Sequence, residues 1–394
     1  MLSLKEVLDR GIISEIIPSR KAFEETAKEK KLRFYIGFDA TGDSLHLGHA
    51  QNLILLEEFR ALGHEVIVLF GDFTARIGDP SDKDSSRAQL SKEQVEKNVE
   101  LWKQQITSLL DFDDKHNPVR VMYNSHWLAK LNFEEILELA TNFTVQQMME
   151  RDMFQKRLEG NKPIYLHEFF YPLMQGYDSV AMDVDVELAG TDQTFNAMSG
   201  RILQKRLNNK EKFVITTNLI ADPDSGKLMS KSQGTGVFLN SSPSELFRSI
   251  MALPDSMSEV LLVRLTRIPL RDIARIIAGD PLSAKEETAY EITKLIHGQK
   301  KAESARDDFN RQVRSKELEE SDFQTLGYKQ EQFLWEVLVQ NQIIPSRNQF
   351  NRLISAGAIK VFATNDTIQD KNVKARNVKL KVGKKHYVSL ISRK

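Results

Sequence analysis

The stretch FDATGDSLHLGHA, residues 38–50, places two histidines around Gly48. It follows the apolar run RFYIGF, residues 33–38, which predicts a buried strand. Residues 48–62 predict a helix, because their apolar side chains recur at helical spacing. The first N–H groups of a helix attract phosphate, imidazoles can donate to its oxygens, and glycine lets a flat ring approach the backbone. The stretch therefore indicates a phosphate site, although two ordinary histidines at a helix start fit it as well.

Strands and helices alternate on both sides of this stretch. EVIVLF (65–70), VRVMYN (119–124) and FVITTNLIA (213–221) predict further buried strands. Ser91 and Gln94 form a capping-box pattern at the head of a long helix. This alternation predicts an α/β fold, with a mostly parallel sheet covered by helices on both faces. Ligands of such sheets bind at the carboxyl ends of the strands, where the strand order switches.

The second half of the chain has a different character. Residues 243–315 predict helices only, and the highly charged stretch 299–322 predicts a solvated helix running into a linker. SRNQFNRLISAGAIKVF, residues 346–362, predicts a helix, a glycine turn and a strand. From Lys371 to Lys394 there are nine Lys or Arg and no acid. This basic end suits a phosphate backbone, and a solubilising tail is the alternative.

Length and composition limit the possible classes. A chain of 394 residues predicts two or three domains. The absence of cysteine excludes disulfides, thiolate metal sites and cysteine catalysis, and we expect no protein metal site. We see no signal-like start and no apolar run long enough for a membrane span, so we expect a cytoplasmic protein without membrane contact.

A glycine- and serine-rich segment follows the last predicted strand. GKLMSKSQGTG, residues 226–236, surrounds Lys227 and Lys231 with small residues. The lysine of such a loop can hold a polyphosphate. An ordinary surface loop is the alternative.

A second polar loop lies between the strand at 65–70 and the helix that begins near residue 91. IGDPSDKDSSR, residues 77–87, places Asp79 beside a turn and directs Lys83 and Arg87 outward. A solvated loop without a ligand explains it equally well.

The mostly apolar stretch EFFYPLMQGYDSVAM, residues 168–182, contains Tyr171, Gln175 and Asp178. Their spacing puts all three side chains on one helix face. Polar groups on a buried face need partners, which could be a small polar ligand or a structural network.

Acids alternate with apolar residues in DVDVELAGTDQTFN, residues 183–196, which predicts a strand with one polar face. The acids of that face are Asp183, Asp185 and Glu187. The predicted strand ends in a tight turn that presents Asp192 and Gln193.

HLGH and MSKS, in this order, resemble the nucleotide-binding signature of class I aminoacyl-tRNA synthetases. The fuller pattern YIGFDAT…HLGH…IGDPS…YPLMQGYD…GTDQ is similar to the tyrosyl-tRNA synthetases, and the resemblance spans nearly the whole chain. It implies a Rossmann-like catalytic domain at 1–236, with dimer-interface helices at about 120–160. A helical anticodon-side domain would follow at 237–325. The unit at 330–394 resembles the small basic RNA-binding domain that many bacterial members share with a ribosomal protein.

The resemblance implies roles for residues that match the motifs. Tyr35 and Asp178 would bond the phenol of the substrate tyrosine, and Gln193 would lie near its carboxylate. The residues implied to hold its ammonium group are Asp79, Tyr171 and Gln175. The residues implied to bind ATP are Asp39, Thr41, His46, Gly48, His49, Asp192 and Lys231, with Asp192 on the ribose. Those implied to grip the departing pyrophosphate are Lys83, Arg87, Lys231 and Ser232.

The chain departs from the family pattern at three places. Ala40 stands where proline is frequent, and Leu228 occupies the first position of the lysine-loop signature. Asp82 replaces a common glycine and adds negative charge beside Lys83 and Arg87, which weakens the case for the roles of these two.

The implied reaction is the activation of L-tyrosine by ATP, followed by transfer to tRNA(Tyr), with Mg²⁺ accompanying ATP and a homodimer as the assembly. Two alternatives remain. A tryptophanyl enzyme would not need the pair Tyr35 and Asp178, and a non-catalytic RNA-binding or splicing-factor paralogue would not need His46, His49 and Lys231.

Overall fold

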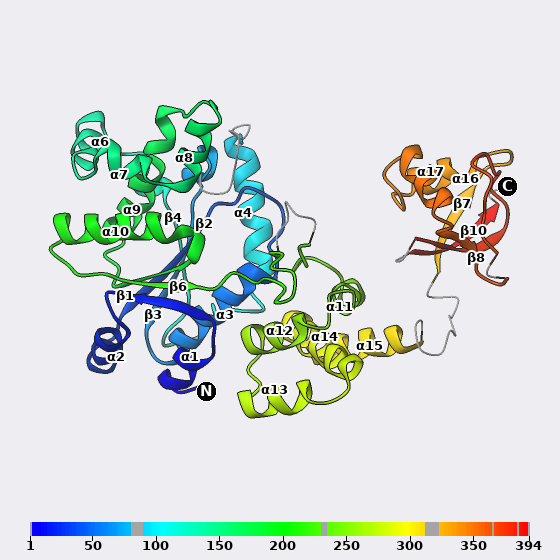
Figure 1. Ribbon diagram of the computed structural model, residues 1–394, viewed down its shortest axis with the longest axis horizontal. Helices are drawn as coiled ribbons and strands as arrows, with labels where there is room; N and C mark the ends of the chain where they lie inside the picture. The colour runs from blue at the N-terminus through cyan, green and yellow to red at the C-terminus, as the bar shows by residue number, and fades with distance from the viewer. Residues whose placement is uncertain are drawn as a thin grey trace. The chain divides into compact units, whose positions relative to one another are not determined.

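The computed structural model describes residues 2–79, 90–229, 235–311, 323–364, 366–383 and 386–392. The chain forms two compact units, residues 1–309 and 310–394 (Figure 1). Within the described residues, no helix combines the length and the apolar character that crossing a membrane requires.

In the described part of the N-terminal unit, six strands form one sheet with the order β1-β6-β5-β2-β3-β4. The strands are β1 (Ile13–Ile17), β2 (Arg33–Phe38), β3 (Glu65–Phe70), β4 (Arg120–Tyr123), β5 (Val186–Gly190) and β6 (Phe213–Thr217). All neighbours pair in parallel except β1, which runs antiparallel to β6. The predicted α/β fold with a mostly parallel sheet is confirmed, and β1 is an addition that the sequence reasoning did not identify.

Helices cover both faces of this sheet (Figure 1). The helices up to β6 are α1 (Leu4–Asp9), α2 (Arg20–Glu29), α3 (Leu47–Ala61), α4 (Lys92–Ile106), α5 (Ser125–Leu128), α6 (Phe133–Ala140), α7 (Val145–Met149), α8 (Asp152–Glu159), α9 (Tyr171–Ala181) and α10 (Thr194–Leu207). Short 3₁₀ turns are η1 (Thr74–Arg76), η3 (Leu166–Phe169) and η4 (Thr191–Gln193). Helices α9 and α10 lie side by side, since a Cβ at Gly176 would stand 2.9 Å from Leu203.

Strand alternation separates two environments. Phe34 and Ile36 belong to the main hydrophobic cluster, where the Phe23 ring of α2 contacts the Phe34 ring edge-on. Tyr35 points to the opposite face, because successive strand residues alternate, and belongs to a smaller cluster with Met182. One face of β2 is therefore wholly apolar, and the other brings a phenol under α9.

The strand order switches between β2 and β5. These two strands pair only at Phe34 with Val186 and at Tyr35 with Glu187, although both continue beyond these pairs. By contrast, β2 pairs with β3 along its whole length up to Phe38. The sheet therefore separates at the carboxyl ends of β2 and β5, which is where ligands of open parallel sheets bind.

The predicted polar strand face at residues 183–188 is partly wrong. Strand β5 begins only at Val186, and Asp183 adopts a left-handed conformation with φ of 47°. The Asp185 carboxylate accepts a hydrogen bond from the Arg33 N–H at 2.9 Å, so it joins the start of β2 to this turn. Glu187 alone of the three acids lies inside the strand.

The predicted helical segment consists of α11 (Pro243–Met251), α12 (Met257–Leu265), α13 (Leu270–Ile277), α14 (Pro281–His297) and α15 (Gln299–Phe309). Its buried residues Leu246, Phe247 and Ile250 share one hydrophobic cluster with the main sheet. The segment therefore belongs to the same compact unit, and the three-domain division of the chain stays a prediction.

The C-terminal unit is a small α+β fold. Its elements are β7 (Gln324–Tyr328), α16 (Leu334–Gln340), α17 (Arg347–Ser355), β8 (Ile359–Val361), β9 (Val378–Val382) and β10 (His386–Ser392), and its sheet order is β7-β10-β9-β8. The predicted helix, glycine turn and strand within residues 346–362 are confirmed, with Gly357 at a φ of 62°.

Candidate functional site

The two histidines of the opening stretch cap helix α3. His46 is the N-cap residue, and its Nδ1 accepts a hydrogen bond from the Gly48 N–H at 3.1 Å. The Nδ1 of His49 accepts in turn from the His46 N–H at 3.1 Å. A Cβ at Gly48 would stand 2.8 Å from Cε1 of His46, so glycine is required there. The flat ring that approaches this glycine is the imidazole of His46 itself.

These hydrogen bonds determine what the imidazoles can donate. Burial lowers the pKa of His46 to about 4 and that of His49 well below its ordinary value, so both rings are neutral near pH 7. A neutral imidazole whose Nδ1 accepts carries its hydrogen on Nε2. The Nε2–H group of each ring can therefore donate to a phosphate oxygen beside the first turn of α3.

Helix α4 holds the loop between β2 and α3. Asn98 donates to the Ala40 carbonyl at 2.8 Å, and Trp102 donates to the Gly42 carbonyl at 2.7 Å. The predicted ATP ligand Thr41 lies between these two anchored carbonyls. Asn98 and Trp102 are i and i+4 on one helix face, so a single face of α4 fixes the loop. Sequence reasoning identified the helix but not this task.

The segment that follows residues 226–236, which contain the lysine-loop signature, lies beside the two histidines. Leu47 N–H donates to the Val237 carbonyl at 3.0 Å, and Leu239 N–H donates to the Leu45 carbonyl at 2.9 Å. The structure thus joins the ends of the two signatures predicted to act together. Lys231 and Ser232 themselves lie outside the described residues, as do Asp82, Lys83 and Arg87.

A polar cluster surrounds Asp39, at the carboxyl end of β2. One Asp39 oxygen accepts from the Tyr171 hydroxyl at 2.8 Å, and the other accepts from the Thr74 hydroxyl at 2.6 Å. A Cβ at Gly71 would come within 2.1 Å of the Asp39 carboxylate, so this glycine makes room for the cluster. Burial and the carboxylates of Asp39 and Asp79 raise the pKa of Tyr171 well above its ordinary value. Two carboxylates beside one phenol can attract an ammonium group, and the Arg151 guanidinium, which lies near Asp79 and Tyr171, offsets part of their negative charge.

The turn after β5 contributes the other side of this cluster. The Gln193 amide donates to Asp79 at 2.6 Å and to the neighbouring Asp192 at 3.2 Å. Asn196 donates to the Gln193 side-chain oxygen at 2.9 Å. The structure therefore places Asp79 and Gln193 together, as their predicted neighbouring roles require.

Asp178 lies deeper, on the same helix face as Tyr171. Its carboxylate accepts from the Trp127 indole at 2.7 Å and from the Asn124 amide at 3.3 Å. Burial raises the pKa of Asp178, while these two donors act in the opposite direction. Burial, with contributions from the carboxylates of Glu187 and Asp178, also raises the pKa of Tyr35, which keeps its phenol protonated. Trp127 and Asn124 follow β4 and were missed, because nothing in the local sequence distinguishes them.

The third residue of the predicted helix face, Gln175, donates to Glu187 at 3.0 Å. Glu187 forms a buried ion pair with Lys212, and Lys212 also donates to Ser179 at 2.8 Å. Sequence reasoning noted Glu187 as part of a polar face and missed Ser179 and Lys212. The face of α9 therefore meets a continuous polar layer on the sheet.

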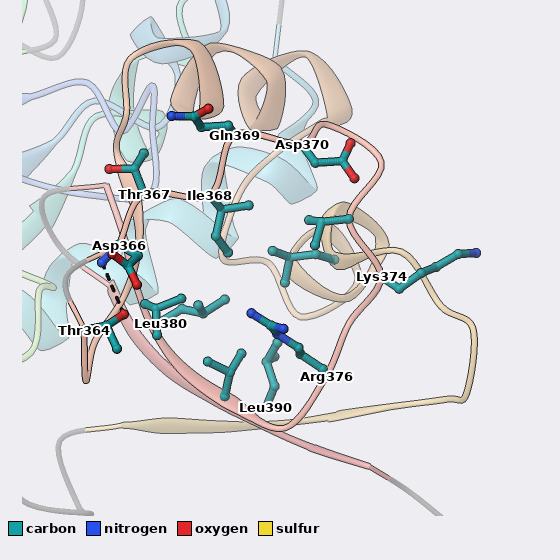
Figure 2. A pocket seen from close by; sticks show the side chains of 14 residues that line it. Thr364, Asp366, Thr367, Ile368, Gln369, Asp370, Lys374, Arg376, Leu380 and Leu390 are labelled. Carbon is teal, nitrogen blue, oxygen red and sulfur yellow. Dashed lines mark hydrogen bonds between the residues drawn. The ribbon is translucent and has the colours of Figure 1, made fainter.

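A cavity of about 350 Å³ lies elsewhere, in the C-terminal unit. Figure 2 shows Leu380 and Leu390 on its wall, Arg376 directed across it and Lys374 pointing away. None of the motif residues of the N-terminal unit lines it. Its location does not coincide with the polar clusters described above, and these clusters have the chemistry expected of an active site.

Comparison with known proteins agrees with this geometry. Residues 27–313 match the family model described as tRNA synthetases class I (W and Y). The chain is 38% identical to the tyrosine–tRNA ligase of Moorella thermoacetica, covering 98% of this chain and 94% of that protein. It is also 38% identical to the tyrosine–tRNA ligase of Carboxydothermus hydrogenoformans, with 99% and 98% covered.

Solved structures show the same likeness. The C-terminally truncated mitochondrial tyrosyl-tRNA synthetase of Coccidioides posadasii is 26% identical, with a TM-score of 0.64 over 77% of this chain and 91% of that one. The family model covers most of the chain, and the relatives match it almost from end to end. This chain therefore belongs to the tyrosyl-tRNA synthetases, within the class I aminoacyl-tRNA synthetases.

Proposed function

We propose that the chain activates L-tyrosine with ATP and transfers the tyrosyl group to tRNA(Tyr). In the first step a carboxylate oxygen of tyrosine attacks the α-phosphorus of ATP, and the bond to the β-phosphate oxygen breaks, giving tyrosyl-adenylate and pyrophosphate. In the second step a hydroxyl of the terminal tRNA ribose attacks the tyrosyl carbonyl, and AMP leaves. The substrate supplies its own nucleophile, so positioning and charge stabilisation carry the catalysis.

The arrangement at the switch in strand order is the observation that supports this proposal most strongly. Polar groups of α9 cover the opening between β2 and β5, and the chain continues from β2 into the histidine-capped start of α3. An amino acid held under α9 would extend its carboxylate toward that helix end. The two substrates would therefore meet at the carboxyl edge of the sheet.

The residues that bind the substrate tyrosine lie in the polar clusters described above. Tyr35 and Asp178 bond the phenol of the substrate, because both lie in the buried layer and Asp178 is held by two donors. The ammonium group lies among Asp79, Tyr171 and Gln175, where carboxylates dominate. Gln193 lies toward the carboxylate of the substrate.

The nucleotide ligands come from the loop after β2, from the histidine-capped start of α3 and from the turn after β5. Thr41, His46 and His49 contact the phosphates of ATP, Gly48 allows the tight helix start, and Asp192 binds the ribose. We retain Asp39 as an ATP neighbour, although hydrogen bonds join it to Tyr171 and Thr74. The pyrophosphate ligands assigned from the motifs are Lys83, Arg87, Lys231 and Ser232. Mg²⁺ enters with ATP, whose phosphate oxygens are its preferred ligands.

The alternatives are not favoured. The family model includes tryptophanyl enzymes, but the relatives named above are all tyrosine enzymes. A pair formed by Tyr35 and Asp178 recognises a hydroxyl, which tryptophan does not have. A cytoplasmic location stays a prediction.

Replacing His46 with Asn tests the nucleotide side. Asn is a good N-cap, so the helix start should persist while the Nε2–H donor is lost. We expect tyrosine-dependent pyrophosphate exchange, measured with ATP and Mg²⁺, to show kcat lowered about 100-fold and little change in KM for tyrosine. His116→Asn, at an exposed site, should match the native enzyme. A raised KM for tyrosine with unchanged kcat would reject the phosphate role.

We assign RNA binding to the C-terminal unit. Lys379 and Lys381 lie on the side of β9 opposite its buried residues, with their ammonium groups 4.7 Å from the Phe323 ring centre and 5.4 Å from that of Tyr387. The Phe362 ring completes an aromatic group there. Cations beside aromatic rings suit a nucleic acid, since they bind phosphates while the rings can stack on bases.

Removing residues 323–394 should leave pyrophosphate exchange intact, because the N-terminal unit is compact by itself. Charging of tRNA should fall strongly, and the dependence of tRNA affinity on salt should become shallower. In the full chain, Lys379→Ser with Lys381→Ser should lower the salt slope by about 2, one per lost phosphate contact. Equal slopes and equal charging rates in all three proteins would make this unit a solubilising tail.

We also propose that the protein is a homodimer through its α6–α8 region. Large apolar side chains are exposed in these helices, with Phe133 at 75%, Leu137 at 52%, Val145 at 69% and Leu158 at 56%, and in the η3 turn that follows, with Leu166 at 74%. Leu139 of α6 and Met148 of α7 share one hydrophobic cluster with Phe169, and the Phe169 ring contacts the Phe154 ring of α8, so the three helices lie close together. Clustered exposed apolar residues mark interaction surfaces, and this cluster overlaps the predicted interface at about 120–160.

Sedimentation of Phe133→Asp with Leu166→Asp tests the interface. A buried unpaired charge in the centre of an interface prevents association, so we expect a monomer where the native chain is a dimer. Leu282→Asp, at an exposed apolar position in α14, should sediment like the native chain. A native chain that is monomeric at micromolar concentration, or a dimeric double variant, would contradict the proposal.

A further inference from the structure

Lys212, directly before β6, is buried completely, with 0% of its surface exposed. Its ammonium group forms the ion pair with Glu187, whose residue is 2% exposed, and donates to the Ser179 hydroxyl at 2.8 Å. A Cβ at Gly200 would stand 2.4 Å from Nζ of Lys212, so the glycine on α10 makes room for this ammonium group. A buried ion pair rarely adds net stability over apolar side chains, which suggests a specific task for it.

The register of the sheet places this ion pair beside Tyr35, which we propose to bind the phenol of the substrate. Tyr35 on β2 is the direct partner of Glu187 on β5, and Glu187 is the partner of Val214 on β6. Lys212 is two residues before Val214, which puts both side chains on the same face. Tyr35, Glu187 and Lys212 therefore lie on one face of the sheet, under α9.

Each group on this face has a limited choice of hydrogen-bond direction. An ammonium group only donates, so the Ser179 oxygen accepts from Lys212. The hydrogen of Ser179 then has two acceptors within reach, the Tyr35 oxygen at 3.1 Å and a Glu187 oxygen at 3.5 Å. The shorter contact favours donation to Tyr35. The hydrogen of Tyr35 is then directed away from Ser179, either to the Glu187 carboxylate, with which the Tyr35 hydroxyl also interacts, or to a bound ligand.

We propose that Lys212, held by Glu187, is a positioning residue that acts through Ser179 and makes the Tyr35 hydroxyl a donor toward the phenol oxygen of the substrate. This inference rests on the proposed tyrosine site. The substrate hydroxyl is both donor and acceptor: it donates to Asp178 and accepts from Tyr35. Without the direction imposed by Lys212, Tyr35 could donate to Ser179 instead, and the substrate oxygen would lose its donor.

Burial lowers the pKa of Lys212, and the Glu187 carboxylate acts in the opposite direction. The remaining oxygen of Glu187 accepts from Gln175 at 3.0 Å. The ion pair therefore also orients a residue assigned to the ammonium end. Selectivity for tyrosine over phenylalanine would depend on side chains that never touch the substrate.

The test is the ratio of kcat/KM for tyrosine to that for phenylalanine in pyrophosphate exchange. Lys212→Met with Glu187→Gln removes the donor and the charge together, and the amide oxygen introduced by the second change can still accept from Gln175. We expect the ratio to fall about tenfold, the size of one hydrogen bond, through a higher KM for tyrosine. The kcat/KM for phenylalanine should stay unchanged, whereas a general structural defect would lower kcat/KM for both amino acids.

A double-mutant cycle identifies the path. In a Tyr35→Phe background, the same Lys212 and Glu187 changes should alter the ratio less than about twofold, because the donor that they direct is already absent. Ser179→Ala is a smaller change that should narrow the ratio in the same direction, and it decides the matter if the double variant does not fold. Lys21→Met with Glu25→Gln, an exposed ion pair of 3.9 Å on α2, is the matched control and should leave the ratio unchanged.

The outcomes separate the two proposals. A native chain that does not exchange with tyrosine would reject the proposed function and this inference with it. A Tyr35→Phe variant with an unchanged ratio would remove the phenol site from Tyr35 and overturn the inference. The inference is overturned, while the proposed function stands, if the ratio of kcat/KM for tyrosine to that for phenylalanine falls in Tyr35→Phe but stays native in both the ion-pair variant and Ser179→Ala.

Discussion

The pairing of Tyr35 with Glu187 is the contact on which the site depends. It is the last pair between β2 and β5, the strands between which the sheet order reverses. Below it, Phe34 and Val186 continue into the main apolar core. Beyond it the strands separate, and α9 closes the opening with polar side chains. A shift of one residue in this register would turn Tyr35 toward the apolar face and remove the site.

The nucleotide half of the site depends on the same strand. Asp39 follows β2 directly, and His46 comes seven residues later, after a loop that α4 anchors at two carbonyls. Rigid elements therefore fix both ends of a short connection between the cluster that we propose to bind the amino acid and the helix that we propose to face phosphate. Fixed geometry matters for this reaction because the enzyme provides no nucleophile. The rate then depends on how well the enzyme aligns its two substrates.

Sequence patterns were most informative where chemistry and spacing coincide locally. The helical face of Tyr171, Gln175 and Asp178, the strand-to-helix turn at His46 and the parallel sheet were all predicted from neighbouring residues, and their placement is confirmed. The site roles of these residues stay predictions. Residues 80–89 and 230–234 lie outside the described part, so the pyrophosphate ligands do too.

What the sequence could not provide depends on contacts across long separations. Lys212 meets Ser179 from 33 residues away, and only the strand register brings it there. The alternation of acids wrongly predicted that Asp183 lies in a strand. A polar–apolar pattern does not reveal the left-handed turn that precedes β5. Gly71 is unremarkable in the sequence, yet the Asp39 carboxylate occupies the space of its missing side chain.

We propose that the buried layer between α9 and the sheet recognises a phenol. Calorimetric binding of L-tyrosine and L-phenylalanine to Asp178→Asn, without ATP, tests it most directly, because Asn keeps the shape and removes the charge. We expect tyrosine binding to weaken about 10- to 100-fold, the range for one charge-assisted hydrogen bond, while phenylalanine binding stays as in the native protein. Unchanged tyrosine affinity, or an equal loss for both amino acids, would contradict it.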